Sequence, residues 1–267
     1  MQTPFCTRQL NKRIMKIATK YISTLSLLLI LFAGTTGCKK NGEKIDSDFT
    51  MSFQTQVNDA NYAINDVYRN ASDIDIIFES FQFYLSDITI VNSDGDGRLV
   101  SEIELFKFDA TGKSTLDFRV PHGNYESIQF GIGVKKELNE ADPANYSEEG
   151  HPLNTIENTY WGWAGMYRFI MNEGRYDTDL DGSFEGIFAY HTGRELSYRT
   201  LSLIHEFVIS KKESNTLSFN IDLYQLLEKP GNEVDVLTEP FYHGSAENED
   251  ISIRISDNMM GAIEIAP

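Results

Sequence analysis

Apolar and polar residues alternate one by one over long stretches of this chain, and this pattern constrains the fold more than any other feature. Phe49, Met51 and Phe53 alternate with polar residues, and the same period recurs in Ile128–Val134 and in Leu217–Leu223. A period of two gives a β-strand one apolar and one polar face. The chain is therefore predicted to consist mainly of β-strands.

Turn-forming residues separate these segments. Glycine, asparagine and aspartate cluster at 92–97 and 179–182, and Pro121–Asn124 reads as a turn before the strand at 128–134. Within 76–91, the apolar positions Phe81, Phe83 and Leu85 are followed, after Ser86 and Asp87, by Ile88 and Ile90. Many short strands with such turns are typical of a β-sandwich or a barrel. We predict an all-β, antiparallel β-sandwich with short helical turns.

Three segments depart from the alternating pattern. Residues 139–147 are predicted to hold a short helical turn, and 224–227 to end their strand with another. Residues 246–260 fit either a helix or an edge strand, although Ile251, Ile253 and Ile255 favour a strand.

The N-terminal segment has the organisation of a bacterial export signal. Five basic residues and no acidic ones precede an apolar run at 21–33, which is shorter than the roughly 20 residues of a membrane-spanning helix. Small residues follow and end at Cys38. A basic region, a short apolar core and small residues predict a signal peptide.

Cys38 gives this signal a further meaning. Gly34–Cys38 resembles a bacterial lipobox, in which the cysteine is lipidated; the alternative is an ordinary signal peptide with an incidental cysteine. We predict a signal peptide at 1–37, a lipidated Cys38 with a polar tether at 38–47, and a single domain at 48–267. A lipoprotein of this kind is expected in the bacterial cell envelope, anchored to the outer membrane on its periplasmic or surface side.

Cysteine and charge limit what the exported part can do. The two cysteines are Cys6 and Cys38, so 39–267 offers no disulfide, thiolate cluster or cysteine nucleophile. Of 23 basic and 40 acidic residues, five basic ones precede Cys38, which leaves 18 basic against 40 acidic and a formal charge of −22. Such a surface disfavours nucleic acid, and the membrane is expected as a partner through the lipid alone.

Enzyme motifs are absent from the sequence. It contains no Gly-x-Ser-x-Gly, no His-Glu-x-x-His and no phosphate-binding glycine loop, and we predict that the protein is not an enzyme. Acidic side chains at alternate positions, Asp177, Asp179 and Asp181, precede Gly182 as in the first half of a calcium loop. Calcium is therefore a possible ligand there. The alternative is a solvated hairpin turn, which favours the same residue types.

Several motifs together resemble the MbnP-like family. They are Phe81–Asp87, the segment Tyr125–Val134 with its Phe-Gly-Ile-Gly, Pro152–Asn154, Trp161-Gly-Trp163 with Tyr167 and Phe169, and Tyr190–Gly193. These proteins are exported β-sandwiches related to methanotroph copper-binding proteins and to the periplasmic partner of methanobactin. The resemblance covers most of residues 50–210.

The resemblance implies copper binding. His191 matches the histidine that ends a Phe-x-His-x-Gly strand of the family, and Trp161 and Trp163 match its Trp-x-Trp element. His243 is similar to a late His-Gly of many relatives, and His151 lies just before the Pro-Leu-Asn motif. Some relatives use a kynurenine ligand, but the Trp-x-His arrangement of one such relative is missing here. The metal residues implied are His191, His243, His151, Trp161 and Trp163.

The residue types agree with this chemistry, because neutral imidazole suits copper and no cysteine competes. We expect a lipid-anchored extracytoplasmic metal-binding protein, with copper binding for acquisition, storage or delivery. The alternative is a surface interaction or glycan-binding β-sandwich without a transition metal, in which Trp161 and Trp163 form part of the core or an aromatic platform.

Overall fold

The alternating segments form strands whose apolar residues are buried, as the sequence predicts. A computed structural model of the protein describes residues 46–164 and 166–267. In β1 (Asp46–Val57), Phe49, Met51 and Phe53 are at most 1% exposed, whereas the residues between them are partly or fully exposed. The described residues all belong to one compact unit. Residues 1–37, Cys38 and most of the predicted tether lie outside the described residues.

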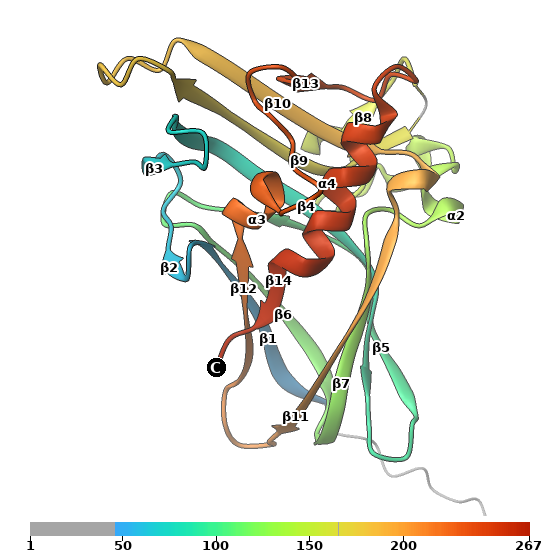
Figure 1. Cartoon of the computed structure of the whole chain (residues 1–267). Helices are drawn as coiled ribbons and strands as arrows, with labels where there is room; N and C mark the ends of the chain where they lie inside the picture. Colours follow the sequence, from blue (N-terminus) through green and yellow to red (C-terminus); the bar gives the residue numbers. More distant parts are fainter. Residues whose placement is uncertain (1–45, 165) are drawn as a thin grey trace, which may run out of the picture. The chain divides into compact units, whose positions relative to one another are not determined.

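One of the two main sheets contains the first strand of the chain. Its order is β14-β12-β1-β2, and β6 also pairs with β1. The remaining bounds are β2 (Ala60–Asn61), β6 (Lys113–Pro121), β12 (Asn215–Asp222) and β14 (Ile263–Ile265). The last strand of the described chain therefore joins the sheet that the first strand begins (Figure 1).

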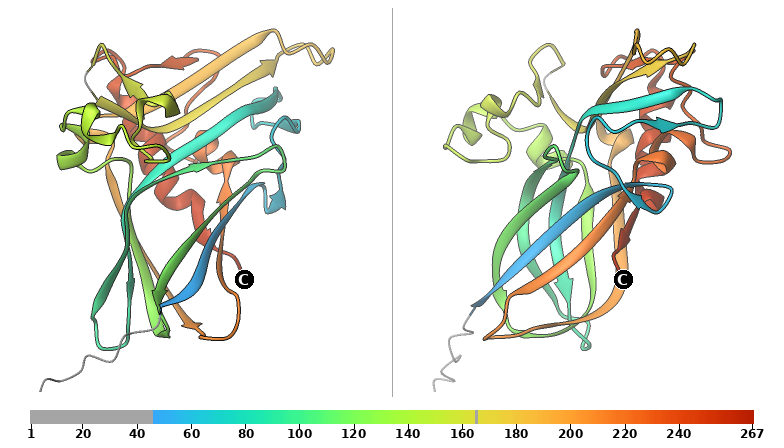
Figure 2. Two further views of the ribbon diagram at one scale, coloured as in Figure 1. Left: turned by 180° about the vertical axis from the view of Figure 1, so that it is seen from behind. Right: turned by 90° about the vertical axis from the view of Figure 1, so that its left-hand side faces the viewer.

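The other main sheet is larger and is organised around β4 (Asp75–Val91). Its order is β11-β7-β4-β9-β10-β13, with β3 and β5 also paired to β4 and β8 paired to β9. The bounds are β3 (Tyr68–Arg69), β5 (Gly97–Lys107), β7 (Gly123–Ile132), β8 (Tyr160–Trp161), β9 (Met166–Asp177), β10 (Gly186–Gly193), β11 (Arg199–Ile209) and β13 (Phe241–Tyr242). The β9–β10 hairpin projects beyond its neighbours (Figure 2).

Both sheets are mixed, so the prediction of an antiparallel sandwich is wrong in part. β1 pairs in parallel with β12, from Phe49 opposite Asn215 to Gln56 opposite Asp222. β10 pairs in parallel with β13 through Ala189 and Tyr190. Alternation defines the faces of a strand but not the direction of its partner, which explains the error.

The change of face at Ser86 and Asp87 is a β-bulge. The pairing of β4 with β7 shifts register between Ser86 and Thr89, and Asp87 has φ = +50°. The extra residue returns Ile88 and Ile90 to the buried face, where both are 0% exposed. This confirms the interruption expected from the sequence.

A large aromatic and aliphatic core lies between the sheets, and a smaller one lies under the segment that precedes β9. The large core includes Phe53, Phe83, Phe106 and Phe219, whose rings contact one another. The smaller core contains Tyr84, Val134, Leu153, Tyr167, Phe169 and Met171. It packs against the N-terminal half of β9 through Tyr167, Phe169 and Met171.

Helices are short, apart from α4 (Glu249–Ala262), which packs against α3 and β10. The helical turns predicted near 139–147 and 224–227 are present as η1 (Pro143–Tyr146) and α3 (Leu223–Glu228), with α2 (Lys136–Asn139) just before η1. Two further single turns are η2 (Thr155–Glu157) and η3 (Glu195–Ser197). Within residues 46–164 and 166–267, no helix is both long and apolar enough to cross a membrane.

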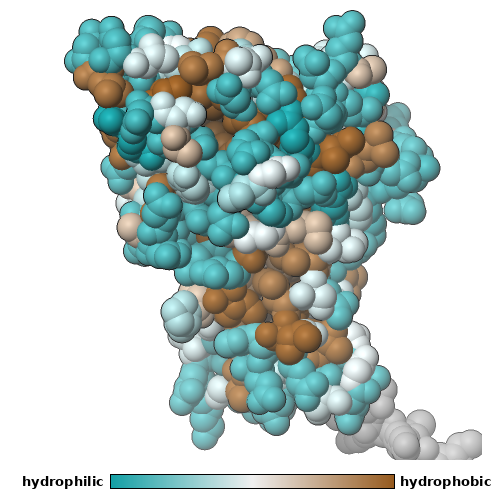
Figure 3. All heavy atoms as spheres, viewed as in Figure 1, coloured by the Kyte–Doolittle hydropathy of each residue, from teal (hydrophilic) through white to brown (hydrophobic). Residues whose placement is uncertain are grey.

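The visible surface is mostly hydrophilic. Figure 3 shows polar residues over most of one face and a hydrophobic area over the lower strands in this view. β11 contributes two exposed apolar side chains to the molecular surface, Ile204 and Val208.

Candidate metal centre

Two of the predicted histidines meet, although 52 residues separate them in the sequence. His191 lies near the end of β10, and His243 directly follows β13, which is paired with β10. Nδ1 of His243 lies 3.0 Å from Nδ1 of His191, with the rings tilted by 72°. The short parallel pairing of β10 with β13 therefore brings the two imidazoles face to edge.

The two imidazoles differ in exposure. His191 is 6% exposed, while His243 is open to solvent on its outer side. Burial lowers the pKa of His191 to about 4, although the hydrogen bond to Glu173 acts in the opposite direction. Burial and the nearby Arg168 guanidinium also lower the pKa of His243. Both rings are therefore neutral at pH 7, which is the protonation state that binds metals.

Glu173 completes the hydrogen bonding of His191. Its Oε1 lies 2.7 Å from Nε2 of His191, on the side of the ring away from His243. Glu173 belongs to β9 and lies opposite Ala189, two residues before His191 in β10. Glu173 could not be identified from the sequence, because nothing there distinguishes one glutamate among 40 acidic residues.

Trp161 packs against both chain segments that carry the histidines. A Cβ atom at Gly193 would lie 2.7 Å from its ring, and one at Gly244 would lie 2.5 Å away. Both positions must therefore be glycine for the indole to rest on the backbone, and Gly244 also has φ = +78°. The Arg168 guanidinium lies 6.0 Å from the centroid of the same ring.

Trp163 has a different environment. It is 67% exposed, and its ring centroid lies 5.7 Å from that of Trp161. An indole nitrogen carries a proton and has no lone pair to offer a metal. In their unmodified form, therefore, Trp161 forms a wall of the site and Trp163 an exposed aromatic surface beside it.

His151 contacts other residues than the two paired histidines do. Its Nδ1 accepts a hydrogen bond from the backbone N–H of Leu153 at 3.0 Å, and its ring stacks on Tyr146. These contacts fix the segment before η2 and occupy Nδ1. The structure therefore groups His191 with His243 and leaves His151 in a structural role.

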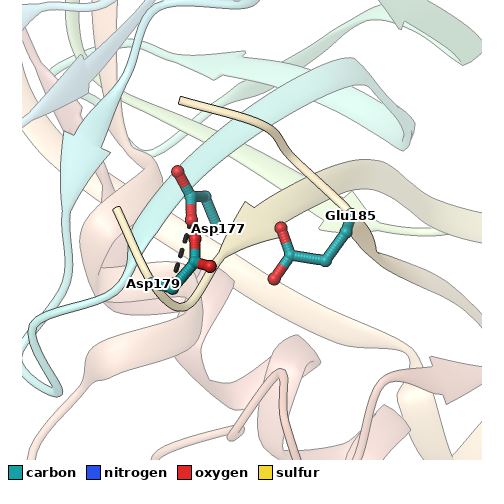
Figure 4. A group of neighbouring side chains, drawn as sticks. All are labelled: Asp177, Asp179 and Glu185. Carbon is teal, nitrogen blue, oxygen red and sulfur yellow. Dashed lines mark hydrogen bonds between the residues drawn. The ribbon is translucent and has the colours of Figure 1, made fainter. Parts of the chain in front are cut away.

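The predicted calcium loop forms the tip of the β9–β10 hairpin. Carboxylate oxygens of Asp177, Asp179 and Glu185 lie within 4.8 Å of one another (Figure 4). Asp181 is not part of this group, and its Oδ1 accepts the N–H of Ser183. Glu185 takes its place because the returning strand brings it back toward Asp177.

The carboxylate of Asp177 already has protein partners. It accepts backbone N–H groups from Asp179, Leu180 and Gly182 at 3.1, 2.7 and 2.8 Å. Although burial raises its pKa, these hydrogen bonds outweigh burial and the pKa is lowered. The loop at 92–97 is organised in a similar way, with Asn92 Oδ1 accepting the N–H groups of Asp94 and Asp96. In both loops, side-chain oxygens therefore accept backbone N–H groups of the turn.

Comparison with known proteins gives the family. A model of the MbnP family matches residues 46–246. The fold is also similar to that of MbnP from Methylosinus trichosporium, with 13% sequence identity and a TM-score of 0.48 over 68% of this chain and 77% of that chain. No curated protein sequence matches the chain. Because the family match spans well over half of its length, the chain belongs to the MbnP family.

Proposed function

We propose that this protein binds copper through the imidazoles of His191 and His243 and serves copper acquisition, storage or delivery. The MbnP family is linked to methanobactin-related copper handling. The observation that carries the proposal is the pair of imidazole nitrogens 3.0 Å apart, supplied by two separate segments of the chain.

The geometry of the pair fits a shared metal ion. Metal–imidazole bonds are about 2 Å long, so two nitrogens on one ion lie between about 2.8 and 4 Å apart as the angle at the metal opens from 90° to 180°. The observed 3.0 Å falls within this interval. Imidazole nitrogen is a suitable ligand for both oxidation states of copper. The exposed side of His243 leaves room for water or for a ligand from a partner.

The test is elemental analysis of protein isolated from its native location without chelator or added metal. We expect about one copper per chain, and loss of that copper in His191→Ala and in His243→Ala. His205→Ala is the matched control, because His205 is an exposed histidine of β11, at the opposite edge of the same sheet from β13. Wild-type copper content and affinity in His191→Ala would contradict the proposal.

The same elemental analysis distinguishes copper binding from the alternatives. Calcium in place of copper would move the site to Asp177, Asp179 and Glu185, where three carboxylates converge on the hairpin tip. The absence of any metal would favour a surface interaction or glycan-binding module. The observation that supports this second function is the exposure of two aromatic side chains, Trp163 and Phe241, which are 67% and 45% exposed. Glycan binding that survives complete demetallation would establish it.

We also propose that the protein is exported and anchored by a lipid on Cys38. The support is the order of a basic segment, a short apolar segment and small residues before that cysteine. Residues 39–267 contain no thiol, which agrees with a location outside the reducing cytoplasm. The lipid would hold the copper site at the cell envelope, on the periplasmic or surface side of the outer membrane.

A further inference from the structure

The ring of His191 is held on both sides, and each side imposes a different hydrogen-bonding role. Nε2 lies 2.7 Å from a carboxylate oxygen of Glu173, and Nδ1 lies 3.0 Å from Nδ1 of His243. An ionised carboxylate accepts hydrogen bonds and does not donate them. When His191 is neutral, its single proton must therefore lie on Nε2 to satisfy Glu173, and Nδ1 carries the lone pair.

From this geometry we infer that Glu173 is a positioning residue: it fixes His191 in the Nε2–H tautomer and so presents Nδ1 as the atom that receives the metal. The metal part of this inference rests on the proposed function, whereas the tautomer does not. Hydrogen bonds from a ligating imidazole to a carboxylate are known to fix the tautomer and the orientation of the ring.

The inference assigns His243 the opposite tautomer in the metal-free protein. Because Nδ1 of His191 has a lone pair, the 3.0 Å contact requires a proton on Nδ1 of His243. A metal held by both imidazoles would require that proton to leave Nδ1 of His243. Because His243 is exposed, Nδ1 could release its proton to water while Nε2 takes one up. The ring would stay neutral, with no net proton release.

Glu173 is well placed for this role on the sheet. In the pairing of β9 with β10, His191 lies opposite Met171, and Glu173 lies two residues further along β9. Diagonal neighbours on one face of an antiparallel pair are within reach of long side chains. The Glu173 side chain is 48% exposed, so replacing it removes a hydrogen bond without opening a cavity in the core.

The test has two readouts on one set of variants, Glu173→Ala, Glu173→Gln and the control Glu79→Ala. Glu79 is a carboxylate of the neighbouring strand β4 that pairs with Arg175. The first readout is the nitrogen chemical shifts of the His191 ring in metal-free protein with chelator at pH 7.5, assigned with His191→Gln. The second is the affinity for added Cu(I) and Cu(II), measured by competition with a chromophoric chelator.

We expect Nε2-protonated His191 in the wild type and in Glu79→Ala, and a mixture of tautomers in Glu173→Ala. Copper affinity should fall about 10- to 100-fold in Glu173→Ala, the usual effect of losing such a partner. The tautomer of His191 and the copper affinity of Glu173→Gln should stay near those of the wild type, because the amide oxygen can still accept the hydrogen bond from Nε2–H.

The two proposals fail in different ways. A proton on Nδ1 of His191 in the wild type, or the same single tautomer in Glu173→Ala, would overturn the inference while leaving copper binding intact. A wild type with the expected tautomer that binds no copper would overturn the proposed function and keep Glu173 as the residue that orders the ring.

Discussion

At the scale of single residues, His191 combines deep burial with a polar ring that is fully engaged. Its two nitrogens contact Glu173 and His243, and the Arg168 guanidinium acts on it from nearby. A neutral ring is compatible with this environment, whereas a protonated one loses solvation and one of its two contacts. The ring therefore links the stability of the metal-free protein to pH.

This linkage has a definite sign. Burial lowers the pKa of His191 from 6.5 to about 4 in the folded protein. The unfolded chain therefore takes up a proton near pH 6.5, before the folded protein does, and the stability that His191 contributes above that pH is lost as the pH falls toward 4. Between pH 7.5 and 5.0 the loss is about 2 kcal/mol.

Urea unfolding of metal-free protein at these two pH values measures the effect. The free energy of unfolding of the wild type, relative to His191→Gln, should decrease by this amount at pH 5.0. The control His205→Gln removes an exposed histidine and should show no comparable change relative to the wild type. An equal difference between wild type and His191→Gln at both pH values would contradict the assignment.

The sequence reached only part of the site at this scale. Imidazole chemistry and the family resemblance identified His191 and His243, but not that they touch. That contact depends on the parallel pairing of β10 with β13. β13 has only two residues, too few for the alternation that would predict a strand. Trp161 was expected as a metal residue, and the structure places its ring against Gly193 and Gly244, which the sequence did not predict.

At the scale of elements, the β9–β10 hairpin carries both groups of candidate residues. Glu173 lies in its middle and His191 toward its base, and Asp177, Asp179 and Glu185 lie at its tip. The tip is organised by the Asp177 carboxylate, which is 0% exposed and accepts three backbone N–H groups. Leu180, with φ = +63°, depends on these bonds for an otherwise unfavourable conformation.

Replacing Asp177 should therefore loosen the tip even without calcium. We expect Asp177→Ala to lower the free energy of unfolding, because the backbone N–H groups of Asp179, Leu180 and Gly182 lose their common acceptor. Hydrogen exchange should accelerate at 178–185. Asp181→Ala is the matched control, since its exposed carboxylate accepts one N–H group, that of Ser183. Equal stability of the two variants in chelator would show that the carboxylate of Asp177 does not organise the turn.

The elements also show where alternation stops being informative. Ile251, Ile253 and Ile255 fit a strand, yet the segment forms α4, in which Ile251, Ile255 and Met259 are buried at a spacing of four. Both periods share Ile251 and Ile255, so the sequence could not separate them. Packing against α3 and β10 decides in favour of the helix.

At the scale of the whole molecule, the charge balance affects which partners can approach the candidate metal site. The exported part would carry a formal charge of −22, which favours the approach of cations. The same charge repels anionic lipid headgroups, so attachment to a membrane would have to come from the lipid that we propose on Cys38.

The two cysteines of the chain allow a direct test of this anchoring. We expect metabolic labelling with a radioactive or alkyne fatty acid to mark the wild type, and Cys38→Ser to lose the label and to leave the membrane fraction. Cys6→Ser is the matched control, because Cys6 lies within the predicted signal peptide and should not affect the mature protein. Labelling of Cys38→Ser at the wild-type level would contradict lipidation at Cys38.

The parallel pairing of β1 with β12 has a consequence for how the molecule folds. Phe49 lies opposite Asn215, a residue 166 positions later in the chain (215 − 49). Contacts of such long range make folding slow, because a large loop must close before they form. His243 lies beyond that partner strand, so we expect the two imidazoles to meet in the same late stage as the sheet. A nascent chain of this design would carry His191 before the imidazole of His243 could lie beside it.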